Sequence, residues 1–141
     1  MDVELVARLR KVIGRLAREL NEASTGDGLT PTQYSVLALI RSRGPLGLAE
    51  LAELEGLNPT MVSRVIRVLD DAGLIRRKPD PADLRAARVE ITPDGVQVHE
   101  HVREVRTRVL TDCLEHLPPA TADALLAAVP AMEDLAEAIR R

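Results

Sequence analysis

Hydroxyl and guanidinium side chains recur on one face of a helix predicted to begin at about Pro59. Val62, Ile66 and Leu69 recur at i, i+4 and i+7, so they are expected to face inward. The opposite, outward face then carries four polar residues: Thr60, Ser63, Arg64 and Arg67. An arginine can donate two hydrogen bonds to guanine O6 and N7, while serine and threonine can reach phosphates or base edges. This pattern predicts a helix that reads the major groove of double-stranded DNA.

The residues before this reading helix complete a helix-turn-helix. A stripe of apolar residues runs along a shorter helix: Leu48, Leu51, Ala52 and Leu54. Gly56 ends that helix, where the backbone needs a positive φ. Asn58 is a favoured N-cap residue, and Pro59 fits the first helical position because its missing N–H would have no partner there. Taken alone, the stretch is also compatible with an ordinary αα-hairpin with a solvated basic face.

Two predicted strands follow the reading helix. Residues 74–78 end in three cations, and residues 88–92 have alternating apolar positions. We expect Asp83, in the polar loop between them, to orient that loop through backbone N–H groups or a salt bridge to Arg85 or Arg88. Two strands joined by such a loop form a wing, whose Arg85 is expected to enter the minor groove. The candidate DNA-binding residues are Asn58, Pro59, Thr60, Ser63, Arg64, Arg67, Arg76, Arg77, Lys78, Asp83, Arg85 and Arg88.

Long amphipathic segments flank this winged helix. Helices are predicted over residues 2–22, over 31–43 and over 93–116. A final helix follows Pro118-Pro119, with a kink or break near Val129 because Pro130 removes a hydrogen bond. The apolar stripes of the terminal helices exceed what a winged helix of about 60 residues can cover, which predicts a homodimer. Two-fold symmetry would place the reading helices on a pseudo-palindromic site, with half-sites roughly 34–36 Å apart.

Charge is distributed unevenly along the chain. The formal net charge is −3, yet residues 58–88 contain seven Lys or Arg against four Asp. Phosphate attraction depends on the local field of the binding face, so an acidic remainder does not oppose DNA binding. No apolar run is long enough to span a membrane and the N-terminal residues lack the order of a secretion signal, so a cytoplasmic location is expected. A single cysteine excludes an internal disulfide framework and fits a reducing compartment.

Short motifs follow one another along nearly the whole chain: Leu29-Thr-Pro-Thr-Gln33-Tyr, Glu50-Leu-Ala, Val62-Ser-Arg64, Leu69-Asp-Asp-Ala-Gly73-Leu-Ile-Arg76, Asp80, Asp83-x-Arg85 and Ile91-Thr92-Pro-Asp-Gly95. Their order and spacing resemble the MarR family of winged-helix transcriptional regulators. The resemblance implies a mainly α fold with a small β-hairpin wing. It places a winged helix-turn-helix at about residues 30–95 and dimerisation helices at about 2–24 and 96–141, all in a single domain of residues 1–141.

The resemblance also implies a function. Family members are commonly repressors, and a small aromatic acid or drug often releases them from their operator. The candidate ligand contact here is Tyr34, for which the alternative is a core tyrosine with a bonded hydroxyl. Two positions depart from the family pattern: Leu84 precedes Arg85 where two basic residues are frequent, and Arg67-Val68 stands where Asp-Arg is common. Both departures bear on the target sequence, and neither removes the wing.

Other chemistry finds little support in the sequence. The hydroperoxide sensors of this family carry a reactive cysteine in the first helix, whereas Cys113 lies in the fifth and is expected to pack as a small apolar residue. Cys113 and His116 could share a metal, but two ligands do not make a site, so no metal or cofactor is expected. No phosphate-binding glycine loop or serine elbow suggests an enzyme. The alternative function is a winged-helix dimer that binds another protein, although the predicted outward face lacks an apolar anchor for one.

Overall fold

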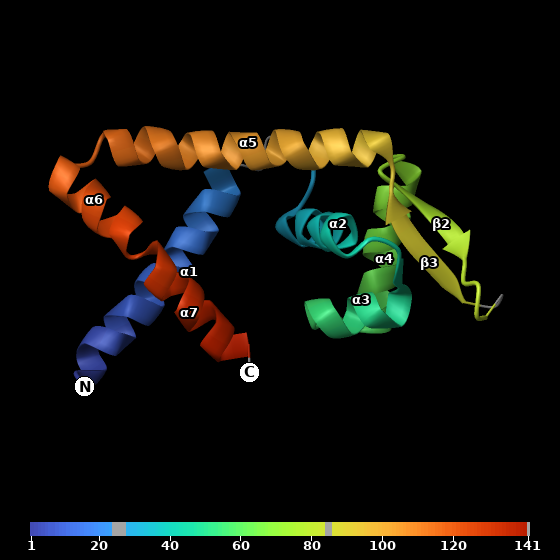
Figure 1. The fold of residues 1–141 in the computed structure, drawn as a ribbon, viewed down its shortest axis with the longest axis horizontal. Helices are drawn as coiled ribbons and strands as arrows, with labels where there is room; N and C mark the ends of the chain where they lie inside the picture. Colours follow the sequence, from blue (N-terminus) through green and yellow to red (C-terminus); the bar gives the residue numbers. More distant parts are fainter. Residues whose placement is uncertain (24–27, 84–85, 141) are drawn as a thin grey trace. The chain divides into compact units, whose positions relative to one another are not determined.

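The computed structural model describes residues 1–23, 28–83 and 86–140, which divide into two compact units, Met1–Arg106 and Thr107–Arg141. None of the described helices combines the length and apolarity needed to cross a membrane. The elements run along the chain (Figure 1) in the order α1 Val3–Ala23, α2 Pro31–Arg43, β1 Leu46–Gly47, α3 Leu48–Glu55, α4 Pro59–Asp71, β2 Ile75–Pro79, β3 Ala87–Ile91, α5 Pro93–Glu115, α6 Pro119–Ala127 and α7 Val129–Arg140.

The core of the first unit is aliphatic and lies where α2, α3 and α4 pack against the sheet. Helix α2 begins with the predicted capping box: Thr30 Oγ1 accepts from Gln33 N at 3.2 Å, and Gln33 Oε1 accepts from Thr30 N at 3.1 Å. The fully buried side chains come from all three helices and the sheet: Val36, Leu37, Ile40, Leu51, Ile66, Leu69, Ile75 and Val89. Each of these three helices thus turns an apolar face toward the core and a second face toward the protein surface.

The reading helix is α4. It begins at the predicted residue and buries the predicted apolar face. Asn58 Oδ1 accepts from Met61 N at 2.9 Å, which caps the helix, and Pro59 occupies its first position. The buried residues of α4 are Val62, Ile66 and Leu69. In α3, by contrast, the predicted stripe is wrong at its end, because Leu54 is 43% exposed. Gly56 turns the chain with φ +66°, and Leu57 packs against the core instead.

The sheet has three antiparallel strands in the order β1-β3-β2, one more than the sequence predicted. In β1, Leu46 pairs with Val89 and Gly47 with Arg88. A strand of two residues carries no detectable alternation, which explains why the sequence did not reveal it. The hairpin of β2 and β3 is the predicted wing, with each strand shifted by one residue. Strand β3 is therefore central, and the wing base is tied to the residue before α3.

The start of α5 is fixed against the turn that ends α4. Thr92 Oγ1 donates to Gly73 O at 2.6 Å and accepts from Gly95 N at 3.0 Å. Thr92 N donates to Leu74 O at 3.0 Å. Gly95 is buried against Leu74, so the backbone of α5 approaches the α4–β2 turn without an intervening side chain. These contacts join the turn after the reading helix to the start of α5 through backbone atoms and the hydroxyl group of Thr92.

Apolar side chains remain exposed on the terminal helices of both units. Helix α1 has no buried residue, and α6 and α7 have none either. The predicted break near Val129 is confirmed, because α6 ends at Ala127 and α7 begins at Val129. The exposed apolar residues include Leu5, Val6, Leu9, Val12 and Leu16 in α1, and Leu125, Leu126, Met132, Leu135 and Ile139 in α6 and α7. Each unit therefore carries an aliphatic surface that a single chain leaves in water.

Candidate nucleic-acid interface

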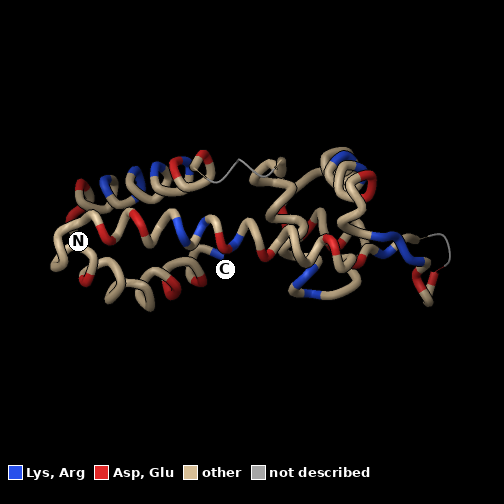
Figure 2. The backbone as a smooth tube through the Cα atoms, turned by 90° about the horizontal axis from the view of Figure 1, so that it is seen from above, with Lys and Arg blue, Asp and Glu red and all other residues tan. Residues whose placement is uncertain are grey.

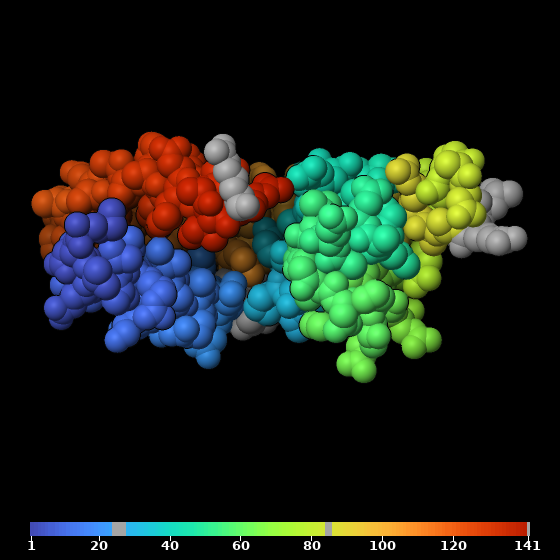
Figure 3. Space-filling view, turned by 90° about the horizontal axis from the view of Figure 1, so that it is seen from below, coloured from blue at the N-terminus to red at the C-terminus, as the bar shows by residue number. Residues whose placement is uncertain are grey.

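A surface hollow of about 340 Å³ lies against the outward face of the reading helix, α4. Thr60, Ser63, Arg64 and Arg67, which we call the reading face, are all exposed on this helix. The hollow brings the four together with two residues from neighbouring elements, and its lining is Leu48, Thr60, Ser63, Arg64, Arg67 and Arg77. Figure 3 shows the surfaces of α3 and α4 (green) beside the wing strands (yellow). The reading face thus has the polar, cationic and concave character that a phosphate-bearing ligand requires.

Arg77 joins the reading face from the wing. It pairs with the buried Val89, and paired residues of an antiparallel ladder share a face, so its side chain leaves β2 on the core side of the sheet. Its Nε lies 3.5 Å from Asp70 Oδ2 in the last turn of α4. Among the described wing cations, Arg77 alone lines the hollow. Side chains of a strand alternate between its two faces, so Arg77, two residues after the buried Ile75, shares its face, and Arg76 lies on the other. This alternation is the sequence signal that distinguishes the two arginines.

The other described wing cations lie on the opposite, outer face of the hairpin, where carboxylates engage them. Arg76 Nε is 3.3 Å from Glu90 Oε1, and Lys78 Nζ is 3.1 Å from Glu90 Oε2. Arg88 Nε is 3.8 Å from Asp80 Oδ2. Figure 2 shows Lys and Arg in blue and Asp and Glu in red along the backbone of the wing strands. Glu90 and Asp80 therefore offset part of the positive charge predicted for the wing.

The wing loop is organised at its first residue. Asp80 Oδ1 accepts from Ala82 N at 2.9 Å, and Asp80 N donates to Ala86 O at 3.2 Å. Asp80 thus makes an Asx-type contact and an ion pair with Arg88. The orienting role expected of Asp83 stays a prediction. The backbone oxygen of Asp83 accepts from Ala86 N at 3.0 Å. Arg85 and its neighbour Leu84 lie outside the described residues, so the minor-groove role of Arg85 stays a prediction.

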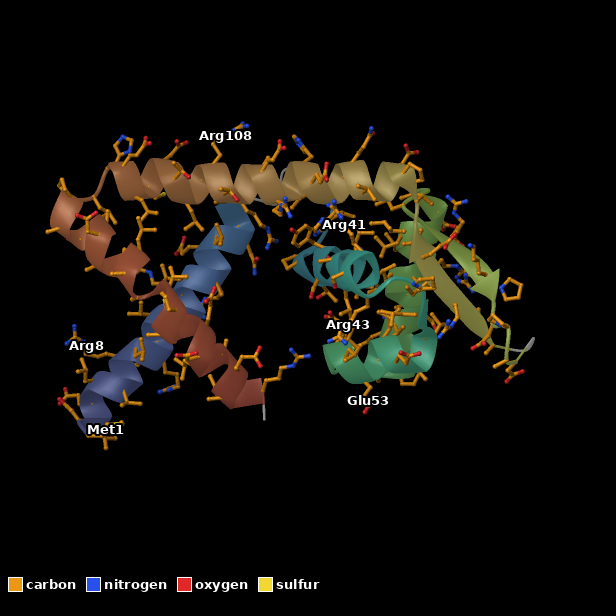
Figure 4. The ribbon with its side chains drawn as sticks, in the orientation of Figure 1. Met1, Arg8, Arg41, Arg43, Glu53 and Arg108 are labelled. Atoms are coloured by element: carbon orange, nitrogen blue, oxygen red, sulfur yellow. The ribbon has the colours of Figure 1, made fainter. Side chains whose placement is uncertain are left out.

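Tyr34, the candidate ligand contact, lies in a cluster of side chains from α2 and α5. Its ring stacks on His99, with centroids 5.2 Å apart and planes 10° apart. Arg106 Cζ is 4.3 Å from the Tyr34 centroid. Arg41 reaches from α2 toward α5 (Figure 4), with Nη1 2.8 Å from His99 Nδ1 and Nη2 2.7 Å from Glu100 Oε1. The half-buried Tyr34 is therefore held by stacking on both an imidazole and a guanidinium.

His99 is buried in the described structure, and no motif in the sequence marks it as part of the site. Gly95, His99 and Val102 recur at i, i+4 and i+7, so helical phase alone places His99 on the inward face of α5. Arg41 is a donor only, so Nδ1 of His99 must accept its hydrogen bond, and the ring is neutral. Burial lowers the pKa of His99 below its ordinary value of 6.5, Arg41 and Arg103 lower it further, and Glu100 opposes them.

We predict that the stability of the protein falls as the pH drops below about 6.5. The unfolded chain protonates His99 near its ordinary pKa of 6.5, whereas the folded chain resists protonation. This contribution to stability is therefore complete above that pH and is lost as the pH falls toward the lowered folded pKa. Melting temperatures between about pH 7.5 and pH 5.5 measure the effect. The control is His99→Asn, whose amide oxygen can accept from Arg41 without titrating, and an equal pH slope in both proteins would contradict the assignment.

Two further predicted features have clear positions. Cys113 is exposed, so the expectation that it packs as a small apolar residue is wrong for the single chain. It lies on α5 in the second unit. Within residues 1–23, 28–83 and 86–140, no three His, Cys, Asp or Glu side chains approach one another closely enough to hold a metal ion.

Comparison with known proteins relates this geometry to a family. The family model described as "MarR family" matches residues 29–87. The HTH-type transcriptional repressor MdtR of Bacillus subtilis is 28% identical, over 97% of this chain and 85% of that protein. The crystal structure of RV1404 from Mycobacterium tuberculosis has a TM-score of 0.81 at 26% identity, covering 97% of this chain and 95% of that one.

A further solved relative was crystallised with DNA. It is a mutant of MarR from E. coli in complex with operator DNA, similar to this chain with a TM-score of 0.66 at 25% identity, over 90% of this chain and 94% of that one. The matched residues span α2, β1, α3, α4 and β2, and the hollow is lined by residues of three of these elements, α3, α4 and β2. Residues 29–87 thus match the MarR family model, and over nearly its full length the chain is similar to HTH-type transcriptional regulators and their solved structures.

Proposed function

We propose that the chain is a homodimeric repressor that acts in the cytoplasm and binds a pseudo-palindromic operator. The observation that carries this proposal is the hollow on the reading face, where three arginines and two hydroxyl side chains converge on exposed α4. Arg64 and Arg67 would read base edges in the major groove, with Thr60 and Ser63 on phosphates or bases. The described wing and Arg85 would follow the adjacent backbone and minor groove. The repressor MdtR and the operator complex of MarR support this role.

A mobility-shift assay against the promoter upstream of the protein's own gene tests the proposal. The wild-type protein should shift this duplex at concentrations that leave a scrambled duplex of the same length free, because specific sites bind far more tightly than random DNA. A titration in which both duplexes shift together, or neither shifts, would contradict the proposal.

The dimer has its own test. The exposed stripes of α1 and of α6 and α7 need a partner, and a second copy of the chain offers the same aliphatic surfaces in return. We therefore expect light scattering to report a dimer at micromolar concentration, and deletion of residues 130–141 to weaken it. Leu9→Glu, within the stripe of α1, should give monomers, whereas Arg15→Glu on its polar side should not. A stable wild-type monomer at this concentration would contradict the proposed dimer.

We infer that a small aromatic acid acts as the effector through the cluster around Tyr34. The guanidinium group of Arg106 lies over this ring, and that of Arg41 contacts His99, which stacks on the ring, so a carboxylate and an aromatic ring would both find partners there. Such a ligand should release the operator duplex from the wild-type protein but not from Tyr34→Leu. Release of both proteins by the same ligand concentration would place the effector elsewhere.

The rival function, a dimer that binds another protein, has one observation in its favour. Met61 and Val68 are 43% and 44% exposed on α4, beside the reading face. Single exposed apolar side chains are common on soluble proteins, and in the major groove they can contact the methyl group of thymine. The arginines that surround them favour DNA as the partner of this face.

A further inference from the structure

Asp70 stands in the last turn of α4, where a carboxylate next to a DNA-binding face would repel phosphate. Its contact with Arg77 suggests a different role. We infer that Asp70 is a positioning residue, which holds Arg77 so that the terminal nitrogens of the guanidinium face the DNA backbone. The inference rests on the proposed DNA-binding function and adds to it the residue that places one of its cations.

The contact uses only one edge of the guanidinium group. The ion pair joins Asp70 Oδ2 to Arg77 Nε at 3.5 Å. An arginine has five N–H donors, and the two terminal nitrogens carry four of them. A carboxylate beside Nε leaves those four donors for another acceptor, and Arg77 lines the hollow with the reading face. The side chains of Arg77 and Asp70 are 49% and 40% exposed, so DNA can reach the pair.

The pair also bridges two elements that must act together. Arg77 belongs to β2 and Asp70 to α4, so the contact crosses from the wing to the reading helix. A free arginine on a strand surface samples many rotamers and loses that freedom when it binds phosphate. Asp70 restricts Arg77 before DNA arrives, and this reduces the entropy lost on binding. Glu90 makes the same kind of contact with Arg76 Nε, but on the outer face of the hairpin and away from the hollow.

Charge-matched variants of two adjacent residues separate positioning from simple repulsion. Asp70→Asn and Asp71→Asn each remove one negative charge from the end of α4, and the described structure shows an ion pair for Asp70 alone of the two. If the carboxylates only repel phosphate, both variants bind DNA more tightly. If Asp70 positions Arg77, Asp70→Asn weakens binding about fivefold while Asp71→Asn leaves it unchanged or tighter.

The probe is a duplex selected by the wild-type protein from a random pool, with a scrambled duplex for comparison, both titrated across a salt series. Asp70→Asn should lower the salt slope by about one unit per half-site, and Asp70→Glu should restore it. In an Arg77→Ala background, Asp70→Asn should have no further effect. Arg77→Lys keeps the positive charge but offers a single side-chain nitrogen for both Asp70 and DNA, so it should lose about as much affinity as Asp70→Asn. This second variant keeps the test valid if Asp70→Asn folds poorly.

The outcomes distinguish the inference from the function beneath it. Wild-type protein that selects no duplex overturns the proposed function and the inference together. Selective wild-type binding with Asp70→Asn as tight as Asp71→Asn overturns the inference alone. Melting curves recorded alongside test whether the ion pair only stabilises the fold. In that case Asp70→Asn would lower the melting temperature and leave the salt slope unchanged. This result too would overturn the inference.

Discussion

Arg64→Ala is expected to weaken binding to the specific site by roughly 1–3 kcal/mol per half-site and to relax the sequence preference. Arg64 is exposed at the middle of the reading face and lines the hollow with Arg67 and Arg77. An arginine in this position can donate two hydrogen bonds to guanine, and alanine leaves those acceptors without a partner. Because a dimer carries two reading helices, the loss should appear at both half-sites.

The measurement is a titration of selected and scrambled duplexes by fluorescence anisotropy. The matched control is Arg76→Ala, which removes the same charge from the outer face of the wing, where Glu90 engages it. The control should weaken both duplexes by a similar small factor, since a loss of charge alone carries no sequence information. If Arg64→Ala also weakened both duplexes equally, Arg64 would not contact bases.

Gly95→Ala is expected to reduce the free energy of unfolding by roughly 3 kcal/mol or more. A Cβ at this position would lie 2.1 Å from Leu74 O and 2.7 Å from Ile91 Cγ1. The carbonyl cannot simply move away, because Leu74 O accepts from Thr92 N at 3.0 Å and Leu74 N donates to Leu69 O at 3.0 Å. Relief of the clash must therefore disturb the end of α4 or the start of α5.

Chemical denaturation of the variant measures this loss. Gly14→Ala provides the control, because a Cβ there meets only the flexible end of Arg18 at 3.5 Å. Alanine inside a helix is favoured over glycine by about 1 kcal/mol, so the control should be neutral or slightly more stable. Equal stability of Gly95→Ala and the wild type would mean that α5 can shift away from the turn at little cost.

The helical framework was predictable because local chemistry marks its boundaries. Thr30 with Gln33, and Asn58 with Pro59, are cap pairs that act within a few residues, and the structure places helices directly after them. The separation of α6 from α7 follows in the same way from Pro130. Strand β1 was not predicted because its two residues gain their structure from pairing with β3, which is distant in sequence. Propensity carries no information about such a contact.

The candidate site was predictable to the extent that it depends on helical phase. The exposure of Arg64 follows from the burial of Ile66 and Leu69 on the other side of α4. The wing cations were treated as one set, and the structure divides them, because the strand period of two sends Arg77 and Arg76 to opposite faces. Which carboxylate pairs with which outer cation depends on the register of the two strands. The register depends on the length and type of the turn, which the sequence does not fix.

The position of β2 at the edge of the sheet has a consequence for self-association. An edge strand presents unpaired backbone groups, and these can recruit a strand from another molecule and start aggregation. Among the described residues, the strand order β1-β3-β2 leaves the outer side of β2 without a partner strand. Its sequence, Ile-Arg-Arg-Lys-Pro, places three cations and a final proline along that open edge. Like charges repel a second copy of this strand, and proline lacks a donor, so the wing can stay exposed for DNA without pairing with the wing of another molecule.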